Sequence, residues 1–166
     1  MKMYYFKLIK EFSKKKNIFN PNIDKIIIRS GIAKFNNDKK HIKYIFESLN
    51  FITGQKPILI KIKKPISNFK SKKGDLACIN ITLRKNLMWN FYYKLINIVA
   101  PKIREFNGFK IKSLDRFGNF HFGIDDCSVF PDFFSEKKFG INISIVLKNL
   151  KKNFLEFYKL INFPIN

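Results

Sequence analysis

Leu76-Ala77-Cys78-Ile79-Asn80-Ile81-Thr82-Leu83-Arg84 is the stretch that decides the fold, because apolar and polar residues alternate along it. One side of the stretch carries the apolar residues Ala77, Ile79, Ile81 and Leu83. The other side carries the polar residues Asn80, Thr82 and Arg84. Successive side chains of a strand point to opposite faces of its sheet, so the stretch predicts a strand with one buried and one open face.

Four further segments share this alternation and predict a sheet with one apolar and one polar face. They are Ile23–Arg29, Ile58–Lys63, Phe120–Ile124 and Ile141–Leu147. In Ile58–Lys63 the isoleucines are expected on one face and the lysines on the other. The polar side of the whole sheet then consists of Lys25, Arg29, Lys61, Lys63, Asn80, Thr82, Arg84, Asn119, His121, Asn142, Ser144 and Lys148.

Segments with helical spacing supply a cover for the apolar face. They are Tyr4–Lys15, a helix capped by Asp38 that runs to about Phe51, Asn86–Val99, and about Lys151–Ile161. Asn86–Val99 is apolar almost all round, which predicts the most buried helix, and Pro101 is expected to loosen or end it. No repeat, linker or break in composition divides the chain. Residues 1–166 are therefore predicted to form a single α+β domain, a largely antiparallel sheet with helices packed on one face and residues 1–20 as an N-terminal helical extension.

The charge of the chain indicates a polyanionic partner. Lys and Arg number 33 against 12 Asp and Glu, which gives a formal net charge of +21. A folded protein with this charge repels itself unless an anion compensates, and nucleic acid is the common compensator. A drift toward residues with A/T-rich codons would explain the many lysines and the 20 phenylalanines, but not the scarcity of acids. We therefore favour nucleic acid over drift.

The polar face of the predicted sheet is where we expect the nucleic acid to bind. Antiparallel sheets often leave one face to water, so a polar face alone would be an ordinary solvated surface. Here Lys and Arg dominate and small hydrogen-bonding residues lie between them, which suits contacts to the phosphates, sugars and base edges of RNA. A second basic feature is a projecting loop at residues 66–75, with the exposed tip Phe69-Lys70-Ser71-Lys72-Lys73-Gly74.

Motifs for catalysis and cofactor binding are not found in the chain. It has no GxGxxG, phosphate-binding P-loop, HExxH or GxSxG sequence, and nothing pairs a nucleophile with a base. His41 and His121 lack metal-ligand spacing, which favours a surface or hydrogen-bonded histidine at each. The acids between Asp115 and Asp132 would bind a cation only if their side chains converged. No stretch approaches the roughly 20 apolar residues that span a bilayer. We therefore expect no enzyme, no cofactor, no metal and no membrane partner.

Several short motifs occur in a specific order and spacing from about Pro21 to the C-terminus. They are Ile52-Thr53-Gly54-Gln55-Lys56-Pro57, Thr82-Leu83-Arg84, Met88-Trp89 followed by Phe91, Ala100-Pro101-Lys102-Ile103-Arg104-Glu105-Phe106 with Gly108, Gly118-Asn119-Phe120, and Phe130-Pro131-Asp132. Together they make the chain resemble the universal large-subunit ribosomal protein family called L-five, in its bacterial and organellar form.

The resemblance implies a structural component of the central protuberance of the large ribosomal subunit. In such proteins the sheet face lies against large-subunit rRNA and 5S rRNA, or a replacement for the latter. Of the positions that the family uses there, the chain keeps Lys25, Gln55 and Thr82. The residues predicted to bind rRNA are Lys25, Arg29, Gln55, Lys56, Lys61, Lys63, Asn80, Thr82 and Arg84.

One departure from the family affects how the RNA would be recognised. Where the family usually has Asn-x-Gly-Val-Gly after the first strand, this chain has Arg29-Ser30-Gly31-Ile32-Ala33. Asparagine both donates and accepts hydrogen bonds, whereas arginine only donates and prefers phosphate. We therefore expect RNA binding with relaxed or altered base reading, and an Arg29 that points into the core would contradict this hypothesis.

The resemblance also implies a contact with P-site tRNA through the loop Ser67–Gly74. The residues predicted to bind tRNA are Phe69, Lys70, Lys72 and Lys73. Lys72 stands where the family has arginine, which keeps the charge but loses the bidentate fork of the guanidinium.

The segment from Glu105 to Glu136 differs in charge from the rest of the chain, because it holds six of the twelve acids. Acids concentrated on a very basic protein suggest contact with a basic protein, the alternative being a solvated loop that avoids rRNA. The resemblance implies an intersubunit bridge with a small-subunit protein of the S-thirteen family. The residues predicted to form the bridge are Asp115, Asn119, Asp125, Asp126 and Asp132.

The expected compartment follows from the codon bias and the N-terminus. Met1–Lys16 is amphipathic and basic but has neither a signal-peptide core nor the composition of an import presequence. A chain of this family with such features is most similar to a product of a mitochondrial genome, with the bacterial cytoplasm or a plastid as alternatives. The alternative function is a stand-alone RNA-binding module outside the ribosome.

Overall fold

The computed structural model describes residues 2–16, 21–35, 38–66, 71–104, 106–131, 133, 138–150 and 153–166. The α-helices are α1 (Lys2–Lys16), α2 (Lys39–Thr53), α3 (Lys85–Lys94) and α4 (Phe154–Leu160). The strands are β1 (Asn22–Gly31), β2 (Ile58–Lys61), β3 (Leu76–Leu83), β4 (Phe120–Ile124) and β5 (Ile141–Lys148). Shorter helical turns are η1 (Ala33–Phe35), η3 (Leu95–Val99), η4 (Ala100–Lys102), η5 (Ile111–Ser113) and η6 (Cys127–Val129).

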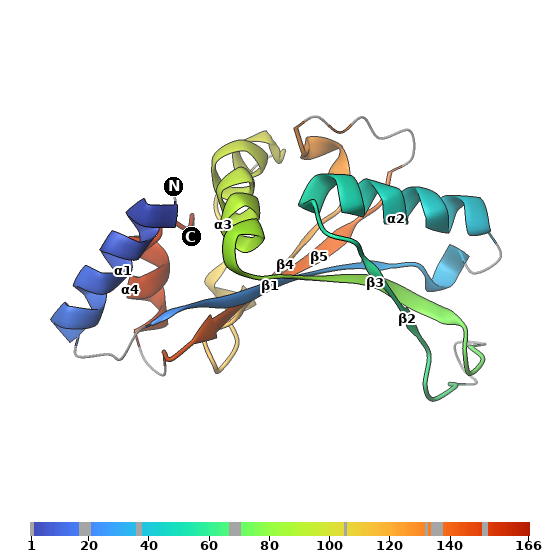
Figure 1. The fold of residues 1–166 in the computed structure, drawn as a ribbon, viewed down its shortest axis with the longest axis horizontal. Coiled ribbons are helices and arrows are strands. Elements are labelled where there is room, and N and C mark those ends of the chain that lie inside the picture. The colour runs from blue at the N-terminus through green and yellow to red at the C-terminus, as the bar shows by residue number, and fades with distance from the viewer. Residues whose placement is uncertain are drawn as a thin grey trace.

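The strands form one sheet in the order β2-β3-β1-β5-β4, with β1 at its centre. β1 pairs with β3 on one side and with β5 on the other, and every ladder of the sheet is antiparallel. Figure 1 shows α2 and α3 over one face of this sheet, with α1 and α4 side by side at one end. The predicted α+β fold, an antiparallel sheet with helices on one face, is confirmed.

The core lies between the helices and the apolar side of the strands. The strand residues that are fully buried there or nearly so include Ile26, Ile28, Ile79, Ile81, Leu83, Ile143 and Ile145. These are the apolar positions of the alternating segments, so the alternation identified the covered face of β1, β3 and β5 correctly.

α2 shows how local sequence sets the ends of a helix. The side chain of Asp38 accepts a hydrogen bond from the backbone N–H of His41 at 3.0 Å, which caps the first turn as predicted. The helix ends at Gly54, whose φ of 68° lies in the left-handed region, and its N–H donates to the carbonyl of Asn50. The turn after Gly54 brings the chain back toward the sheet.

α3 is less buried than its composition predicts. Seven of the 15 residues of α2 are buried but four of the 10 of α3, so the prediction that this segment forms the most buried helix is wrong. Leu87 of α3 is 40% exposed. The reason is that Leu87 borders a surface groove between the end of α2 and α3, which leaves this side of the helix open. The α-helix changes to a π-turn at Leu95–Val99 and then to the 3₁₀ turn Ala100–Lys102 that contains Pro101, as expected for a proline that loosens a helix end.

α1 is part of the same core. The ring of Tyr5 stacks on Trp89 of α3 at 5.2 Å between centroids, and Phe12 meets Phe157 of α4 edge-on at 5.9 Å. α4 begins at Phe154 in the described part of the chain, whereas the sequence predicted a start near residue 151, which lies outside it. The N-terminal helix is therefore packed onto the domain.

β2 departs from its prediction. Ile58, Leu59 and Ile60 are 65%, 41% and 37% exposed, so no isoleucine face is buried. The ladder sets Ile58 opposite Asn80 and Ile60 opposite Cys78, and directly opposite residues point to the same side of a sheet. Both isoleucines therefore share the polar face of β3. The physical reason is that β2 is an edge strand, and alternation predicts two faces without saying which is covered.

Candidate nucleic-acid interface

We call the side of the sheet opposite α2 and α3 the open face. The ladder registers place on it Lys25, Ile27, Arg29, Ile58, Ile60, Cys78, Asn80, Thr82, His121, Gly123, Asn142, Ser144, Val146 and Lys148. No described helix covers these residues in Figure 1, and the sheet arches so that the open face lies on its inner side. The face combines cations, small hydrogen-bonding groups and aliphatic side chains, so it is more apolar than predicted.

Arg29 lies at the centre of a row that crosses the sheet. Asn80 of β3 and Asn142 of β5 lie directly opposite it, and Ile58 and Gly123 extend the row to the two edge strands. The Nε of Arg29 donates to Oδ1 of Asn80 at 3.1 Å, and the side chain is exposed. This bond orients the guanidinium over the open face and uses one of its five donors. An Arg29 side chain in the core would have contradicted the hypothesis that the face binds RNA with altered base recognition. The side chain lies outside the core.

A second row runs parallel to the first. It consists of Thr82, Ile27, Ser144 and His121 on neighbouring strands. The Nδ1 of His121 lies 2.9 Å from the hydroxyl oxygen of Ser144. Hydroxyl and imidazole groups at this spacing form hydrogen bonds with sugars and base edges as well as with each other.

Gln55 connects the end of α2 to the sheet. Its side-chain amide Nε2 donates to the backbone carbonyl of Thr82 at 3.1 Å. The backbone N–H of Gln55 lies 3.3 Å from the hydroxyl of Thr53, which in turn donates to the carbonyl of Leu49. These bonds give Gln55 one orientation at the margin of the open face, next to the exposed Lys56.

Asp24 is a residue of this region that the sequence did not reveal. One carboxylate oxygen of Asp24 lies 3.7 Å from Nζ of Lys25 and 3.3 Å from Nη1 of Arg84. Ion pairs near the surface contribute little stability, so these two do not hold Lys25 and Arg84 firmly. The alternation of apolar and polar residues did not predict these ion pairs, because Asp24 lies where the register between β1 and β5 shifts.

The β2–β3 hairpin carries the second group of predicted residues. Hydrogen bonds between Ile62 and the Gly74-Asp75 pair extend the hairpin beyond its ladder, and Figure 1 shows its described residues extending away from the helices. Lys61, Lys63, Lys72 and Lys73 are all exposed on this hairpin. The predicted contacts Phe69 and Lys70 lie outside the described residues.

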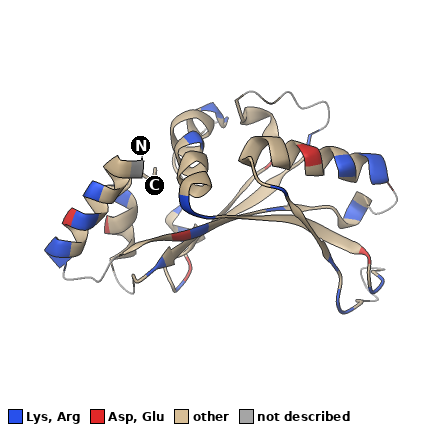
Figure 2. Cartoon of the chain, in the orientation of Figure 1, with Lys and Arg blue, Asp and Glu red and all other residues tan. Residues whose placement is uncertain are grey.

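Positive charge by itself does not select the open face. Figure 2 shows Lys and Arg on α1 and α2 as well as on the strands and the hairpin. The α2 side carries the exposed lysines Lys39, Lys40 and Lys43, of which Lys43 pairs with Glu47 at 3.7 Å. What distinguishes the open face is the combination of cations with ordered rows of hydrogen-bonding side chains on an uncovered sheet.

The acids predicted to form one bridge surface are divided in the structure. Asp115 precedes β4 and Asp125 follows it, and a strand of this length separates its ends by about 17 Å. Asp126 caps η6 by accepting from the N–H of Ser128 at 2.9 Å, and Lys138 lies 4.0 Å from its carboxylate. Asp132 lies outside the described residues. Asp115 and Asp125 thus lie at opposite ends of β4, and their membership in one bridge surface stays a prediction.

Asp115 is occupied within its own turn. Its Oδ1 accepts the backbone N–H groups of Phe117 and Asn119, both at 2.8 Å. Its Oδ2 accepts from Nδ2 of Asn119 at 2.7 Å and lies 3.4 Å from Nε2 of His121. Oδ1 of Asn119 accepts the N–H of Leu147 at 3.1 Å, which ties the turn to β5. Asp115 and Asn119 thus hold the turn together from within.

We expect Asp115→Asn to destabilise the protein by about 1 kcal/mol at pH 7, because one acceptor oxygen and its charge are lost. Partial burial alone would raise the pKa of Asp115, but the donors of Asn119, His121 and Phe117 outweigh it and hold that pKa below its usual value. A lowered folded-state pKa contributes stability above the unfolded pKa of about 4, and this stability is lost as the pH falls through the folded value.

The unfolding free energies of wild type and Asp115→Asn should therefore differ by about 1 kcal/mol at pH 7. This difference should become smaller below about pH 4, where the Asp115 carboxylate is protonated. Urea unfolding at both pH values measures it, with Asp125→Asn at an exposed carboxylate as the control. A difference of the same size at pH 7 and pH 3 would contradict the role of the Asp115 carboxylate.

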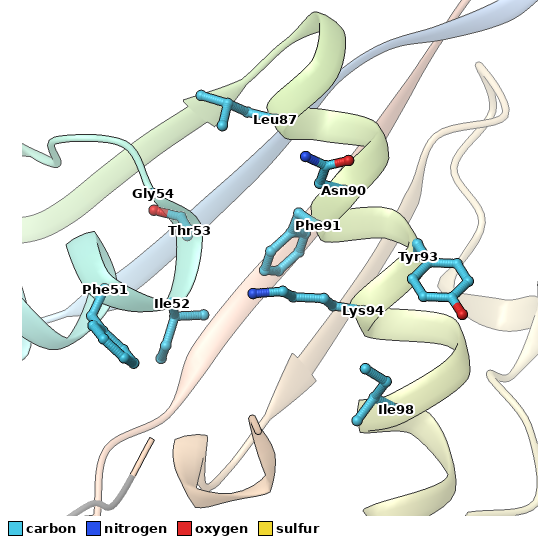
Figure 3. Close-up of a pocket in the computed structure, with 10 residues that line it drawn as sticks. All are labelled: Phe51, Ile52, Thr53, Gly54, Leu87, Asn90, Phe91, Tyr93, Lys94 and Ile98. Atoms are coloured by element: carbon cyan, nitrogen blue, oxygen red, sulfur yellow. The ribbon is translucent and has the colours of Figure 1, made fainter. Parts of the chain in front are cut away.

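A groove of about 430 Å³ lies on the other side of the molecule, between the end of α2 and α3. It is lined by Phe51, Ile52, Thr53, Gly54, Leu87, Asn90, Phe91, Tyr93, Lys94 and Ile98. Figure 3 shows the Lys94 side chain extending from α3 toward Phe51 and Ile52. Lys94 is the one charged residue among these ten, and most of the others are apolar.

The remaining predictions about sites concern histidines, metals and membranes. His121 is exposed as expected, but His41 is buried and its Nε2 has no hydrogen-bond partner among the described residues, so the prediction for His41 is wrong. The described part of the chain holds no group of three or more His, Cys, Asp or Glu side chains placed to bind a metal. No described helix is long and apolar enough to cross a membrane.

Comparisons with known proteins agree on one family. A family model described as ribosomal protein L5 matches residues 18–72, and a second model, described as the C-terminus of the same ribosomal family, matches residues 77–164. The chain is similar to the large ribosomal subunit protein uL5 of Wigglesworthia glossinidia brevipalpis, with 39% identity over 99% of the chain and 98% of the relative. The uL5 of Pseudothermotoga lettingae is 41% identical over 95% of the chain and 86% of the relative. The protein named uL5m of Reclinomonas americana is 42% identical over 88% of the chain and 86% of the relative.

Proposed function

Because the chain belongs to the ribosomal protein L5 family, a family of structural and non-enzymatic ribosomal proteins, we propose that its open face binds the rRNA of the large ribosomal subunit. As a member of that family the protein is a structural constituent of the large subunit, and it acts in translation without catalysing a reaction. The observation that carries the proposal is the row centred on Arg29, in which an exposed guanidinium is oriented by Asn80 on an uncovered sheet.

The chemistry of the open face suits a structured RNA. Arg29, Lys61 and Lys63 present exposed cations to phosphates, and such contacts position the protein on the RNA. Asn80, Thr82 and Gln55 supply neutral groups for sugar and base-edge contacts. The aliphatic side chains between them accommodate the apolar faces of riboses and bases. We propose the central protuberance as the location, with 5S rRNA or a replacement as the second RNA.

Sedimentation tests the ribosomal assignment against a stand-alone RNA-binding module. A ribosomal constituent should migrate with the large subunit in sucrose gradients and remain there through a wash at high salt. A free module should appear at the top of the gradient and bind RNA with an affinity that falls steeply as salt rises. Recovery of the chain only in the top fractions would overturn the proposal.

The β2–β3 hairpin is proposed to contact P-site tRNA. Lys72 and Lys73 are exposed at its projecting end, and the N–H of Lys72 donates to the Asp75 carboxylate at 2.8 Å, which shapes the turn. Point charges without a bidentate fork steady a nucleic-acid backbone and do not read its sequence. Phe69 and Lys70 are part of the same proposal.

We expect Lys72→Ala with Lys73→Ala to lower P-site tRNA occupancy of the ribosome about threefold to tenfold, because two phosphate contacts are removed. Filter binding of tRNA to purified ribosomes measures this effect. Lys40→Ala with Lys43→Ala on α2 is the matched control, since it removes the same charge elsewhere. Equal occupancy for both double variants would show that the hairpin lysines do not act on tRNA.

The intersubunit bridge with a small-subunit protein of the S-thirteen family is proposed at the end of β4 that carries Asp125. This residue is exposed, whereas Asp115 and Asn119 are used inside their turn. Asp126 and Asp132 belong to the same proposal. One carboxylate oxygen of Asp126 already accepts a hydrogen bond from the backbone N–H of Ser128. A basic partner would meet negative charge at this end.

Asp125→Asn with Asp126→Asn should weaken association of the two subunits and leave assembly of the large subunit intact, because the change touches charge and not the core. Light scattering during subunit joining measures the first property, and sedimentation of the large subunit measures the second. A large subunit that fails to assemble while joining of the residual particles is normal would contradict the bridge.

The compartment belongs to the same proposal. Ribosomes of bacteria or organelles are where proteins of this family act, and we propose a mitochondrial ribosome in the matrix, with the bacterial cytoplasm or a plastid as alternatives. Support comes from the residues with A/T-rich codons and from the similarity to uL5m of Reclinomonas americana.

A further inference from the structure

Phe117 is the most exposed aromatic side chain among the described residues, at 77%. It occupies the tip of the turn Asp115–Asn119, which precedes β4. Single apolar side chains on a surface are common, so exposure alone does not indicate a function. The way in which the ring is held is the second observation.

Three hydrogen bonds from two residues, Asp115 and Tyr158, hold the backbone under Phe117. The Asp115 carboxylate accepts the N–H of Phe117 itself at 2.8 Å and that of Asn119 at the same distance. Tyr158 of α4 donates its hydroxyl to the carbonyl of Gly118 at 2.9 Å. A residue presented from such a fixed turn loses little conformational freedom on binding, which favours affinity.

The position of the turn relates it to the open face. Nε2 of His121, an open-face residue, lies 3.4 Å from the Asp115 carboxylate at the base of the turn. Figure 1 shows the loop before β4 extending on the same side of the sheet as the described part of the β2–β3 hairpin. The inner side of the arched sheet is thus bordered by the hairpin at one end and by this turn at the other.

The segment that leads into the turn carries exposed cations. Lys110, Lys112 and Arg116 are exposed in the segment that leads into the turn, and the carboxylate of Asp115 is already engaged by hydrogen bonds. An exposed aromatic ring flanked by Lys and Arg is the combination with which proteins bind unpaired nucleotides, the ring stacking on the base and the cations contacting the phosphates. A protein-binding hot spot would instead place the ring among several apolar side chains, whereas residues 110–116 expose one large apolar side chain, Ile111 at 48%.

We propose that the turn Asp115–Asn119 is an RNA-contact element in which Phe117 stacks on an unpaired base and Arg116 contacts an adjacent phosphate. This inference rests on the proposed function, binding of rRNA by the open face, and adds a site at its border. It also gives Asp115 and Asn119 the role of holding the stacking residue in place, in contrast to the predicted contact with a small-subunit protein.

The test uses the full-length chain and large-subunit rRNA from the same organism. Filter binding gives the affinity, and acylation of 2′-hydroxyls in the presence and absence of protein gives the nucleotides that it contacts. We expect Phe117→Ala to lower the affinity by about 5- to 150-fold and to remove the protection of one or a few unpaired nucleotides. Phe117→Trp should retain both properties, and Phe117→Leu should behave like the alanine variant, because stacking needs a ring.

The control variant is Phe51→Ala, which removes a 62% exposed phenylalanine from the helix side of the protein. It should leave affinity and protections unchanged, and thermal unfolding should show that every variant is folded. The proposal fails if Phe117→Ala binds like wild type, if the leucine variant binds as well as the tryptophan variant, or if the lost protections fall on paired nucleotides. In these cases Arg29→Ala still tests the open face separately. If the wild-type protein does not bind rRNA at all, the proposed function is wrong, and the proposed stacking by Phe117 is then wrong as well.

Discussion

Replacing Arg29, Lys61 and Lys63 together by alanine should lower the affinity for large-subunit rRNA by about a hundredfold to a thousandfold at 0.1 M salt. Each phosphate contact releases roughly 0.7 to 0.9 counterions, so three contacts are worth about two to three powers of ten at that salt concentration relative to 1 M. The three side chains are exposed, and they lie on the open face and on the adjoining β2–β3 hairpin. The slope of log affinity against log salt should fall by about 2 to 3.

The matched control for this variant is Lys39→Ala, Lys40→Ala and Lys43→Ala on α2. It changes the net charge of the protein by the same amount on the side of the helices, where the three lysines are exposed. If binding were a response to net charge alone, the two triple variants would lose the same affinity. Equal losses would therefore refute the open face as the interface, and a loss confined to the first variant would support it.

The second large effect is expected from Gly118→Ala, which should destabilise the protein by about 3 kcal/mol. Gly118 has a φ of 80°, in the left-handed region that a residue with a Cβ adopts at a cost of about 1–2 kcal/mol. A Cβ at this position would also overlap the ring of Phe154 on α4. The hydroxyl of Tyr158 holds the carbonyl of the same glycine, so the turn has no simple way to move aside.

The melting temperature of Gly118→Ala should fall by about 6–12 °C, as expected for a domain of this size. Gly31→Ala is the control, because Gly31 lies at the exposed end of β1 and a Cβ there would meet no atom within 4 Å. We expect its melting temperature to stay close to that of wild type. A Gly118→Ala protein that melts within about 2 °C of wild type would show that the turn adjusts freely.

Much of the fold could be predicted because it depends on local chemistry. Alternation in β1, β3 and β5 follows from the geometry of a strand, and the covered face was identified correctly at Ile26, Ile79 and Ile143. The cap at Asp38 and the loosening at Pro101 were also foreseen, because each depends on a few neighbouring residues. Two predictions about the fold failed, the burial of β2 and the rank of α3 as the most buried helix. Both depended on whether a distant element lies above these segments.

The candidate site shows the same division at the level of single residues. Alternation placed Arg29 and Asn80 on one face, but only pairing in register made them neighbours across β1 and β3. Their sequence separation is 51 residues, so no local pattern contains their hydrogen bond. The ion pair between Asp24 and Arg84 was missed for the same reason, since these residues are 60 positions apart.

The sequence by itself determined the class of fold, the strongly positive charge and the family to which the chain belongs, because these follow from composition, from periodicity and from short motifs in order. Only the tertiary structure decided which groups act together. It set Arg29 in a row with Asn80 and Asn142, and it separated Asp115 from Asp125 at the two ends of β4. It also left Phe117 exposed at the tip of a turn braced by α4. The physical reason is that contacts between side chains far apart in sequence depend on strand register and helix packing, and these arise from the whole chain folding at once.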